Sequence, residues 1–353
     1  MIEEYVLNVC FLLTFLFVYA KWFICRPLTA ASPFPVRQKA AIVIVVFGAL
    51  LFPLAWIDWS ADDPLSMDLN HALAALAALI GGMASSAAAC LAVLRRIDAI
   101  RNRLMLNEHR MLRDMELARR IQQSVLPAAA ESACITIKGL HIPSGQVSGD
   151  MYMWRLVQGD KALIILTDVM GHGVSSSLVS MYIHAYLQSM PENVIDPVDI
   201  VKQLNMRLCG LFQTEAEGGG AMYCTAVCLL ADARRRQVEY VNAGHPYGMM
   251  LSDGESFDEL VQGGMTLGID AKADFQRGTA AFRRNARIIL FTDGLFEVYG
   301  ASPAATSQRM RELLEACGGL DTDCLIRELA NELSQGSHMP DDICVIALDI
   351  KEA

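Results

Sequence analysis

The sequence predicts an α+β domain that follows a helical linker and three membrane-spanning helices. Long apolar runs occupy the first 94 residues, a stretch without Gly or Pro follows, and the remainder alternates strand-like runs with paired helical segments. Strands that arrive in runs, with helices grouped in pairs, are typical of layered α+β domains and not of a βαβ repeat. We therefore divide the chain into a membrane anchor (1–94), a linker (95–126) and a C-terminal domain (127–353).

Three apolar segments are long enough to cross a bilayer. They cover residues 5–25, 40–57 and 71–94, and each approaches the ~20 residues that a membrane helix requires. A cleaved signal peptide is the alternative for the first segment, but Glu3 and Glu4 stand where such a peptide has basic residues. A buried helix of a soluble domain is the alternative for the third, Ala-rich segment.

The charges beside these segments predict their orientation. The first connection is basic, the second carries only acidic charges, and basic residues follow the third segment. Because basic loops stay in the cytoplasm, we expect the N-terminus outside, three crossings, and the C-terminal domain in the cytoplasm. The basic residues are Lys21, Arg26, Arg37, Lys39, Arg95, Arg96, Arg101 and Arg103, and the acidic ones are Asp58, Asp62, Asp63 and Asp68.

The linker has the pattern of a coiled coil with a polar middle. Apolar residues recur every seven positions at Ile97, Leu104, Met111, Ala118 and Val125. The d-like positions of the same heptads hold Ile at 100 and 121, but the two d-like positions between them hold Asn107 and Asp114. This pattern predicts a homodimer that pairs through a parallel coiled coil. The alternative is a single amphipathic helix that lies on its own domain.

The overall charge excludes nucleic acid as an expected partner. The chain has a formal net charge of −10, and the acidic excess lies after Arg103, whereas phosphate binding requires a basic face. An acidic domain can present a solvated surface or collect carboxylates around divalent cations. The ten cysteines form no CxxC pair, so we expect reduced thiols and no structural zinc, with Cys224 and Cys228 on one face of a strand.

The C-terminal domain contains six strand-like runs rich in β-branched and aliphatic residues. They cover residues 134–142, 162–169, 222–230, 236–244, 287–293 and 343–350, and helices are expected over 174–190, 197–213, 306–316 and 321–334.

Aspartates lie at the ends of several of these strands. Asp150 follows the turn SGQVSG, Asp168 and Asp293 end apolar runs and precede Gly-containing turns, and Asp341 and Asp342 open the last strand. Any one of them alone is an ordinary turn or cap residue. Together, as oxygen donors without a nearby Cys or His cluster, they favour Mg²⁺ or Mn²⁺ over zinc.

Seven sequence blocks, in order, resemble the SpoIIE/RsbU branch of the PPM metal-dependent protein phosphatases. They are ELARRIQQSVLP (116–127), SGDMY (148–152), TDVMGHG (167–173), NAGHP (242–246), TLGI (266–269), FTDGLFE (291–297) and DDICVIAL (341–348). Each block alone is weakly specific, but their order makes the resemblance strong, and it covers about 116–350.

The resemblance implies a PPM-type α-β-β-α sandwich with two Mn²⁺ or Mg²⁺ ions at one end. Asp168 would bridge the two ions, the carbonyl of Val169 would bind one of them, and Asp293 and Asp341 would hold the other. Asp150 would be a direct ligand or would orient a metal-bound water. Asp342 adjoins Asp341 and stays an alternative ligand.

Further residues of these blocks have expected roles that follow from the resemblance or from local pattern. His172 would assist protonation of the leaving group or pack locally, and Gly149, Gly171, Gly173 and Gly294 would allow close turns. The serines at 175–177 fit N-capping hydroxyls and not nucleophiles. The chain departs from the family pattern at Met153 and Cys344, and it has Asn285-Ala286 where Gly-Asp is common.

The implied activity is that of a protein serine/threonine phosphatase. A metal-activated water would hydrolyse phosphoserine or phosphothreonine, and the substrate would be a STAS-type anti-sigma-factor antagonist in bacterial partner-switching signalling. The membrane segments then predict a multi-pass protein of the bacterial inner membrane.

Two other classes of function remain open at this stage. A catalytically silent membrane adaptor would bind a partner through the same domain, but the intact Asp168, Asp293 and Asp341 weigh against it. A histidine kinase or nucleotide cyclase is disfavoured because no phosphate-cradling GxGxxG or P-loop accompanies the linker.

Overall fold

The structure is a computed structural model and describes residues 69–213, 222–246, 248–299, 303–317, 321–334 and 339–352. The predicted membrane segments at 5–25 and 40–57 lie outside the described residues. The chain divides into two compact units, Met1–Arg110 and Met111–Ala353, and the second unit contains all the strands described below.

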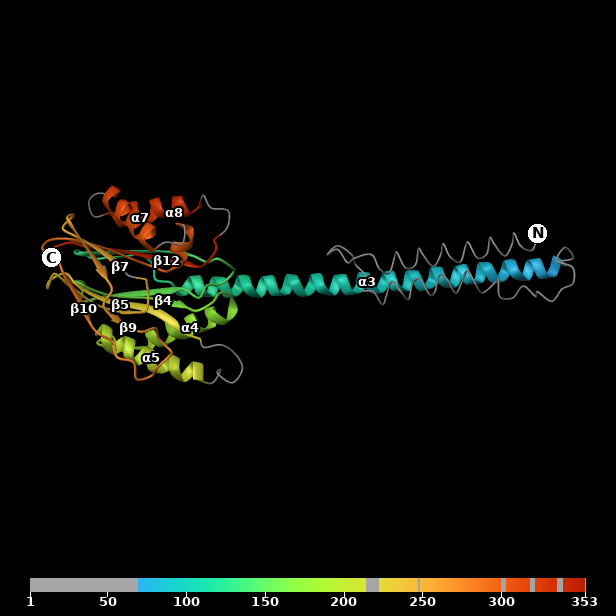
Figure 1. Cartoon of the computed structure of the whole chain (residues 1–353), viewed down its shortest axis with the longest axis horizontal. Coiled ribbons are helices and arrows are strands. Elements are labelled where there is room, and N and C mark those ends of the chain that lie inside the picture. Colours follow the sequence, from blue (N-terminus) through green and yellow to red (C-terminus); the bar gives the residue numbers. More distant parts are fainter. Residues whose placement is uncertain are drawn as a thin grey trace. The chain divides into compact units, whose positions relative to one another are not determined.

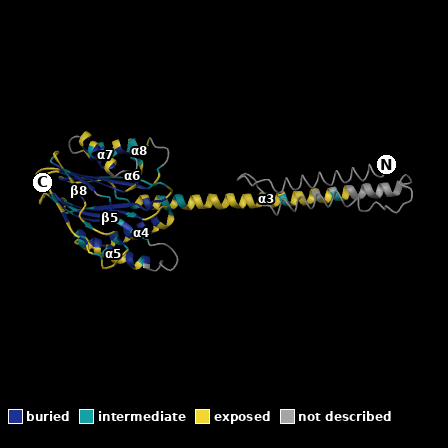
Figure 2. Ribbon diagram, viewed as in Figure 1, coloured by how far each residue is buried: buried dark blue, intermediate teal, exposed yellow. Residues whose placement is uncertain are grey.

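One long helix covers both the third predicted membrane segment and the linker. Helix α3 spans Leu69–Val125, with 57 residues and no break between the two regions. Over Ile80–Val125 it is long and apolar enough to cross a membrane, a criterion of length and composition only. The heptad residues Leu104, Met111 and Ile121 expose their side chains to solvent, as Figure 2 shows for most of the helix. Coiled-coil pairing stays a prediction.

The described strands form two sheets, which we call sheet A and sheet B. Sheet A has the order β1-β2-β12-β11-β7-β8, and sheet B has the order β10-β6-β5-β4-β3, with β9 beside β6. Among the described strands the pairing is antiparallel except for β6 with β9. The strands are β1 (Ala130–Glu131), β2 (Ile135–Ile142), β3 (Met151–Val157), β4 (Lys161–Val169), β5 (Cys224–Asp232), β6 (Gln237–Ala243), β7 (Gly248–Ser252), β8 (Ser256–Leu260), β9 (Gly263–Gly264), β10 (Gly278–Ala281), β11 (Ala286–Phe291) and β12 (Ile343–Ile350).

Helices cover the outer face of each sheet, which gives four layers (Figure 1). Helices α4 (Val174–Ser189) and α5 (Pro197–Gln213) pack on sheet B. Helices α6 (Gly294–Val298), α7 (Pro303–Ala316) and α8 (Thr322–Ser334) pack on sheet A. The layered α+β domain that the sequence predicts, and the α-β-β-α sandwich that the family resemblance implies, are therefore confirmed.

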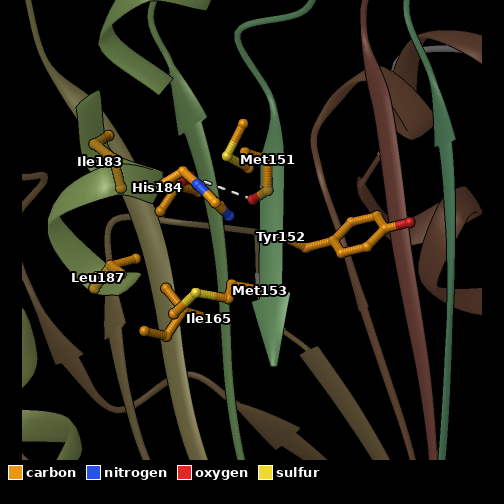
Figure 3. A pocket seen from close by; sticks show the side chains of 8 residues that line it. Met151, Tyr152, Met153, Ile165, Ile183, His184 and Leu187 are labelled. Carbon is orange, nitrogen blue, oxygen red and sulfur yellow. Dashed lines mark hydrogen bonds between the residues drawn. The ribbon is translucent and has the colours of Figure 1, made fainter. Parts of the chain in front are cut away.

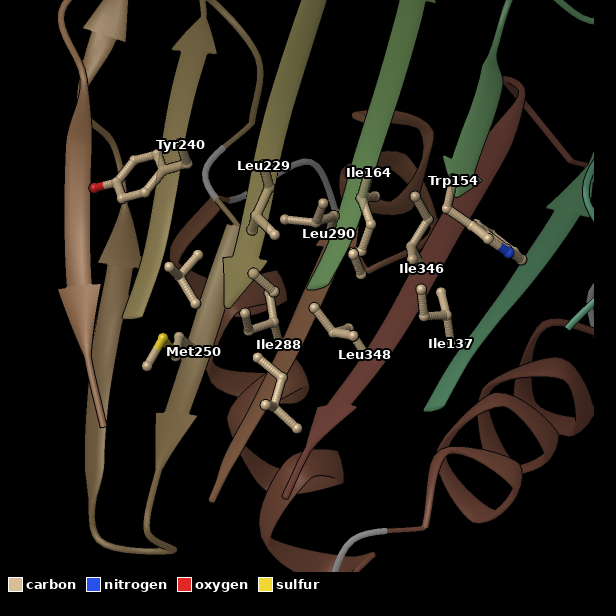
Figure 4. Close-up of a cluster of buried hydrophobic side chains, with 14 of the residues drawn as sticks. Ile137, Trp154, Ile164, Leu229, Tyr240, Met250, Ile288, Leu290, Ile346 and Leu348 are labelled. Carbon is tan, nitrogen blue, oxygen red and sulfur yellow. The ribbon is translucent and has the colours of Figure 1, made fainter. Parts of the chain in front are cut away.

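Apolar side chains on both faces of the central strands hold the layers together. Along β12, Ile346 and Leu348 point into the core between the sheets, whereas Val345 and Ala347 belong to the cluster under α7 and α8. Figure 4 shows the inter-sheet core, in which Ile164 and Leu290 come from opposite sheets. Burying each such side chain contributes about 1.5–3 kcal/mol. Because both faces are buried, these strands read as continuous apolar runs.

Each of the six predicted strands and four predicted helices is found close to its expected range. Strands β1, β3, β7, β8, β9 and β10 and helix α6 were not anticipated. Cys224 and Cys228 lie in one apolar cluster on the same face of β5, as expected.

The prediction that serines cap the helix after GHG is wrong. Helix α4 begins at Val174, its N-cap is Gly173, and no side chain caps it. Ser176 Oγ donates to Gly173 O (3.1 Å) and Ser177 Oγ donates to Val174 O (2.8 Å). The hydroxyls therefore bond backward into the first turn, because the preceding glycine allows the chain to enter the helix without a side-chain cap.

Candidate active site

The predicted aspartates gather at one end of the sandwich. Asp150 directly precedes β3, and Asp168 is the last residue but one of β4; since these strands pair Met151 with Thr167, both aspartates lie at the same end of sheet B. Asp293 follows β11 and Asp341 precedes β12, and the pairing of Phe291 with Val345 brings both to one end of sheet A. Electrostatic coupling of Asp168 to Asp293 and Asp341 connects the two sheets at this end.

The two aspartates of sheet B are held in a poorly hydrated position. Burial, followed by the charge of Asp168, raises the pKa of Asp150 well above its ordinary value. Burial, followed by the charge of Asp293, raises the pKa of Asp168 to about 7. Like charges that cannot escape into water disfavour ionisation, so this group of carboxylates is electrostatically unsatisfied without cations.

The two aspartates of sheet A lie nearer the solvent. Asp293 is exposed and Asp341 is half-buried. Loss of surrounding water and the charges of Asp341 and Glu297 raise the pKa of Asp293. Asp341 Oδ1 accepts a hydrogen bond from the Asp342 amide (2.8 Å). Both carboxylates thus keep oxygen atoms available toward Asp168.

Asp342 serves a different purpose from its neighbour. It is buried, with 3% of its surface exposed. One carboxylate oxygen accepts from Ser144 N (2.7 Å) and Ser144 Oγ (2.8 Å), and the other accepts from Gly149 N (2.8 Å). Three donors therefore occupy this carboxylate, which fixes the loop leading to Asp150.

Two glycines permit the close approach of these segments. A Cβ atom at Gly149 would lie 2.9 Å from Val169 O and 3.1 Å from Gly171 O. A Cβ atom at Gly294 would overlap the carbonyl oxygen of Asp342. Any side chain at these positions would push Asp150 away from Val169 or Asp293 away from β12.

The donor set fits divalent cations of the Mg²⁺ or Mn²⁺ type. Asp150 Oδ2 is buried and has no hydrogen-bond partner, which leaves a carboxyl oxygen that a cation would satisfy. The carboxylates and the Val169 carbonyl are hard oxygen donors, as these ions prefer. Within the described part of the chain, no group of three or more Asp, Glu, His or Cys side chains is arranged to hold an ion as it stands. The ligand assignments to Asp150, Asp168, Val169, Asp293 and Asp341 therefore stay predictions.

Other residues of the site were missed by sequence reasoning. Thr292 is fully buried, interacts with Asp150, and its Oγ1 accepts from Cys344 N (2.9 Å). His245 is buried between the sheets, although its motif NAGHP was recognised without a role. His172, in contrast, is exposed to solvent.

A small cavity next to β3 shows the surroundings of Met153, one of the positions where the chain departs from the family pattern. The cavity, of about 10 Å³, lies between sheet B and α4, and Met153, Ile183 and His184 line it (Figure 3). Its volume suits one water molecule at most. Met153 thus fills an apolar layer, where the family pattern often has an aspartate.

The profile of the family described as Stage II sporulation protein E (SpoIIE) matches residues 158–351. The chain belongs to the SpoIIE family. The matched range contains Asp168, Asp293 and Asp341 and begins just after Asp150. This family carries a serine phosphatase domain of the PP2C type, and the four-layer fold of this chain agrees with it.

Two named relatives are phosphatases of Bacillus subtilis. The chain is 31% identical over 242 residues to Phosphoserine phosphatase RsbP, a match that covers 68% of this chain and 58% of the relative. It is 25% identical over 254 residues to Phosphoserine phosphatase RsbU, covering 68% of this chain and 73% of that protein. The chain therefore spans little more than half the length of RsbP.

Solved structures share the fold. The SiaA-PP2C domain of Pseudomonas aeruginosa superposes with a TM-score of 0.57 at 24% identity, covering 69% of this chain and 98% of that domain. The PP2C phosphatase domain of SpoIIE from Bacillus subtilis gives a TM-score of 0.53 at 18% identity, covering 64% of this chain and 66% of that structure. Both likenesses show that this chain shares the fold of these two domains.

Proposed function

We propose that this chain is a metal-dependent protein serine/threonine phosphatase that removes phosphate from a phosphorylated protein. The observation that carries the proposal is the convergence of Asp150 and Asp168 from one sheet with Asp293 and Asp341 from the other. Burial, followed by the charges of the neighbouring carboxylates, raises the pKa of Asp168 and Asp293 in this group. The names of the relatives RsbP and RsbU support the same reaction class.

The residues divide the chemical work as follows. Asp150, Asp168, Asp293, Asp341 and the Val169 carbonyl would hold two Mn²⁺ or Mg²⁺ ions. Such ions, when bound, would lower the pKa of a water ligand toward neutral pH and would neutralise charge on the phosphoryl oxygens. Asp342 fixes the loop before Asp150 through its three hydrogen bonds. Asp293 and Asp341 lie toward the solvent, so a phosphorylated side chain of another protein can reach this end of the sandwich.

The proposed substrate is a phosphoserine or phosphothreonine of a STAS-type anti-sigma-factor antagonist in bacterial partner switching. The support comes from the relatives RsbP and RsbU and from the acidic character of the chain, which makes nucleic acid a poor partner.

We further propose that three membrane helices anchor the chain in the inner membrane with its N-terminus outside, and that α3 pairs two copies as a coiled coil. The charge pattern and the exposed heptad residues of α3 support this arrangement.

The test is phosphate release from a phosphorylated STAS protein by the full chain in detergent. Hydrolysis is expected with Mn²⁺ or Mg²⁺, and it should disappear with a chelator and in Asp168→Asn. Full activity in chelator, or unchanged activity of Asp168→Asn, contradicts the proposal. Inactivity with saturating metal and tight binding of the STAS protein would instead favour the silent adaptor.

A further inference from the structure

The turn NAGHP places a buried histidine in a rigid backbone frame. Asn242 Oδ1 accepts from His245 N (2.8 Å), and Asn242 Nδ2 donates to His245 O (2.9 Å) and to Leu260 O (3.3 Å). One amide side chain thus holds both backbone groups of His245. The residue His245 is only 6% exposed, so the surrounding protein and not the solvent determines where its imidazole ring lies.

The hydrogen bonds of the ring select a single tautomer. His245 Nε2 lies 3.1 Å from the carbonyl oxygen of Phe291, and Nδ1 lies 2.7 Å from Thr225 Oγ1. A carbonyl oxygen can only accept, so Nε2 carries the proton and donates it, and Nδ1 accepts from the threonine hydroxyl. Burial also lowers the pKa of His245 to about 3, which agrees with a neutral ring.

The two partners of the ring belong to different sheets, each next to a carboxylate of the site. Thr225 on β5 is the cross-strand partner of Asp168 on β4. Phe291 ends β11, two residues before Asp293. Many of the side chains packed between the two sheets are apolar, and apolar contacts do not fix direction. A neutral imidazole, with one hydrogen-bond donor and one acceptor, fixes the direction of both of its contacts.

We propose that His245 is a positioning residue that sets the separation of Asp168 and Asp293 and thereby the affinity of the carboxylate group for divalent cations. The role rests on the proposed function, because it assumes that these carboxylates hold the cations. It acts through Thr225 and the Phe291 carbonyl, without contact to substrate or metal. Removing groups that orient metal ligands typically weakens metal affinity about 10- to 100-fold.

The test compares Mn²⁺ affinity among variants of the full chain, measured by electron paramagnetic resonance of free Mn²⁺. His245→Ala should weaken binding at least about tenfold, and His245→Gln, which restores a donor toward Phe291, should recover part of it. His184→Ala is the matched control, since His184 is equally buried but lies on the outer side of sheet B. Imidazole ¹⁵N spectra should show the Nε2–H tautomer in the wild type.

Each result has a distinct meaning. If His245→Ala is destabilised to the same extent as His184→Ala but binds Mn²⁺ like the wild type, the histidine is only a packing residue and the inference fails while the phosphatase proposal stands. If the wild type binds Mn²⁺ but releases no phosphate, the phosphatase proposal fails and the affinity ratio still tests His245. A wild type that binds no Mn²⁺, or an Nδ1–H tautomer, overturns the inference.

An independent observation concerns two cysteines at the junction of α7 and α8. Cys317 Sγ and Cys324 Sγ lie 2.8 Å apart, and both residues are free thiols. Cys317 is held by its carbonyl, which accepts from Arg287 Nη1 (2.7 Å), and Cys324 N donates to Asp321 Oδ1 (3.0 Å). Two sulfurs presented together from anchored backbones form a disulfide with little movement.

We infer that Cys317 and Cys324 are a site of reversible disulfide formation, with a small-molecule disulfide as oxidant. Cys324 is the accessible thiol, because it is half-buried whereas Cys317 is 3% exposed. The Cys324 thiolate attacks the oxidant, which releases one small thiol and leaves a mixed disulfide. The Cys317 thiolate then attacks the Cys324 sulfur and releases the second small thiol; the two protein protons pass to the two released thiolates.

Glutathione disulfide is the probe, and peptide mapping of the native full chain is the readout. A Cys317–Cys324 cross-linked peptide is expected, which dithiothreitol removes and Cys324→Ser abolishes. A mixed disulfide at Cys324, or unmodified Cys317 and Cys324, without the cross-link while circular dichroism shows a folded chain, overturns the inference.

Discussion

Substitution by alanine should affect mainly the stability of the domain at Asp342 and mainly the binding of Mn²⁺ at the neighbouring Asp341. Asp342→Ala removes the acceptor of Ser144 N, Ser144 Oγ and Gly149 N. The hydroxyl can turn elsewhere, which leaves two backbone donors, and each unsatisfied buried donor costs about 1–3 kcal/mol. We expect a loss of about 4 kcal/mol, and hence a fall in Tm of about 8–16 °C for a domain of this size.

Asp341→Ala removes the acceptor of a single hydrogen bond at a half-buried position. Its cost should be about 1 kcal/mol, or about 2–4 °C in Tm, but Mn²⁺ binding should weaken at least about tenfold.

Thermal unfolding and Mn²⁺ titration of the full chain measure both effects. Asp258→Ala, an exposed position on β8, controls for loss of one negative charge. Equal falls in Tm for the two variants would refute the assignment of Asp342 to the loop. A larger loss of Mn²⁺ affinity in folded Asp342→Ala than in Asp341→Ala would reverse the two roles.

Three further predictions concern the glycine contact, the buried ion pair and pH. Gly294→Ala should abolish Mn²⁺ binding, because its Cβ would overlap the Asp342 carbonyl; unchanged titration contradicts this. Asp349→Ala should cost about 3–5 kcal/mol in denaturant unfolding, since it leaves Arg287 unpaired where both side chains are 2% exposed; a loss below 1 kcal/mol argues against the pair. The pKa of Asp168 is raised to about 7. The metal-free folded state therefore keeps a proton on this carboxyl that the unfolded chain loses near pH 4. Because the folded state binds more protons in this window, the free energy of unfolding without metal should fall as the pH rises from about 4 to about 7. Mn²⁺ should offset this fall at pH 7.5, and a flat stability profile across that window would contradict the raised pKa.

The sequence allowed most of the sandwich to be predicted because its central strands are buried on both faces. Apolar runs such as the one ending at Asp168 or at Asp293 are long and unbroken, and a carboxylate after such a run marks the strand end. Strand β3 was missed because its sequence, MYMWRLV, has a single β-branched residue, Val157, and an arginine interrupts the apolar run. The continuity of α3 was also hidden, since the chain was divided by hydropathy at Arg95 although no helix breaker lies there.

Sequence reasoning could not separate residues whose roles depend on distant partners. Asp341 and Asp342 are adjacent, and their difference arises from Ser144 and Gly149, which lie almost two hundred positions away. The same holds for His245, whose partners come from two different sheets. Propensity and spacing report on local structure, whereas these contacts arise from tertiary packing.

The most direct test of the account is the location of Mn²⁺ in crystals of the protein, from anomalous scattering at the manganese edge. The account predicts two peaks about 3.5–4 Å apart, bounded by Asp168 from sheet B and by Asp293 and Asp341 from sheet A. Anomalous peaks elsewhere, or none at this end of the sandwich at saturating Mn²⁺, would contradict it.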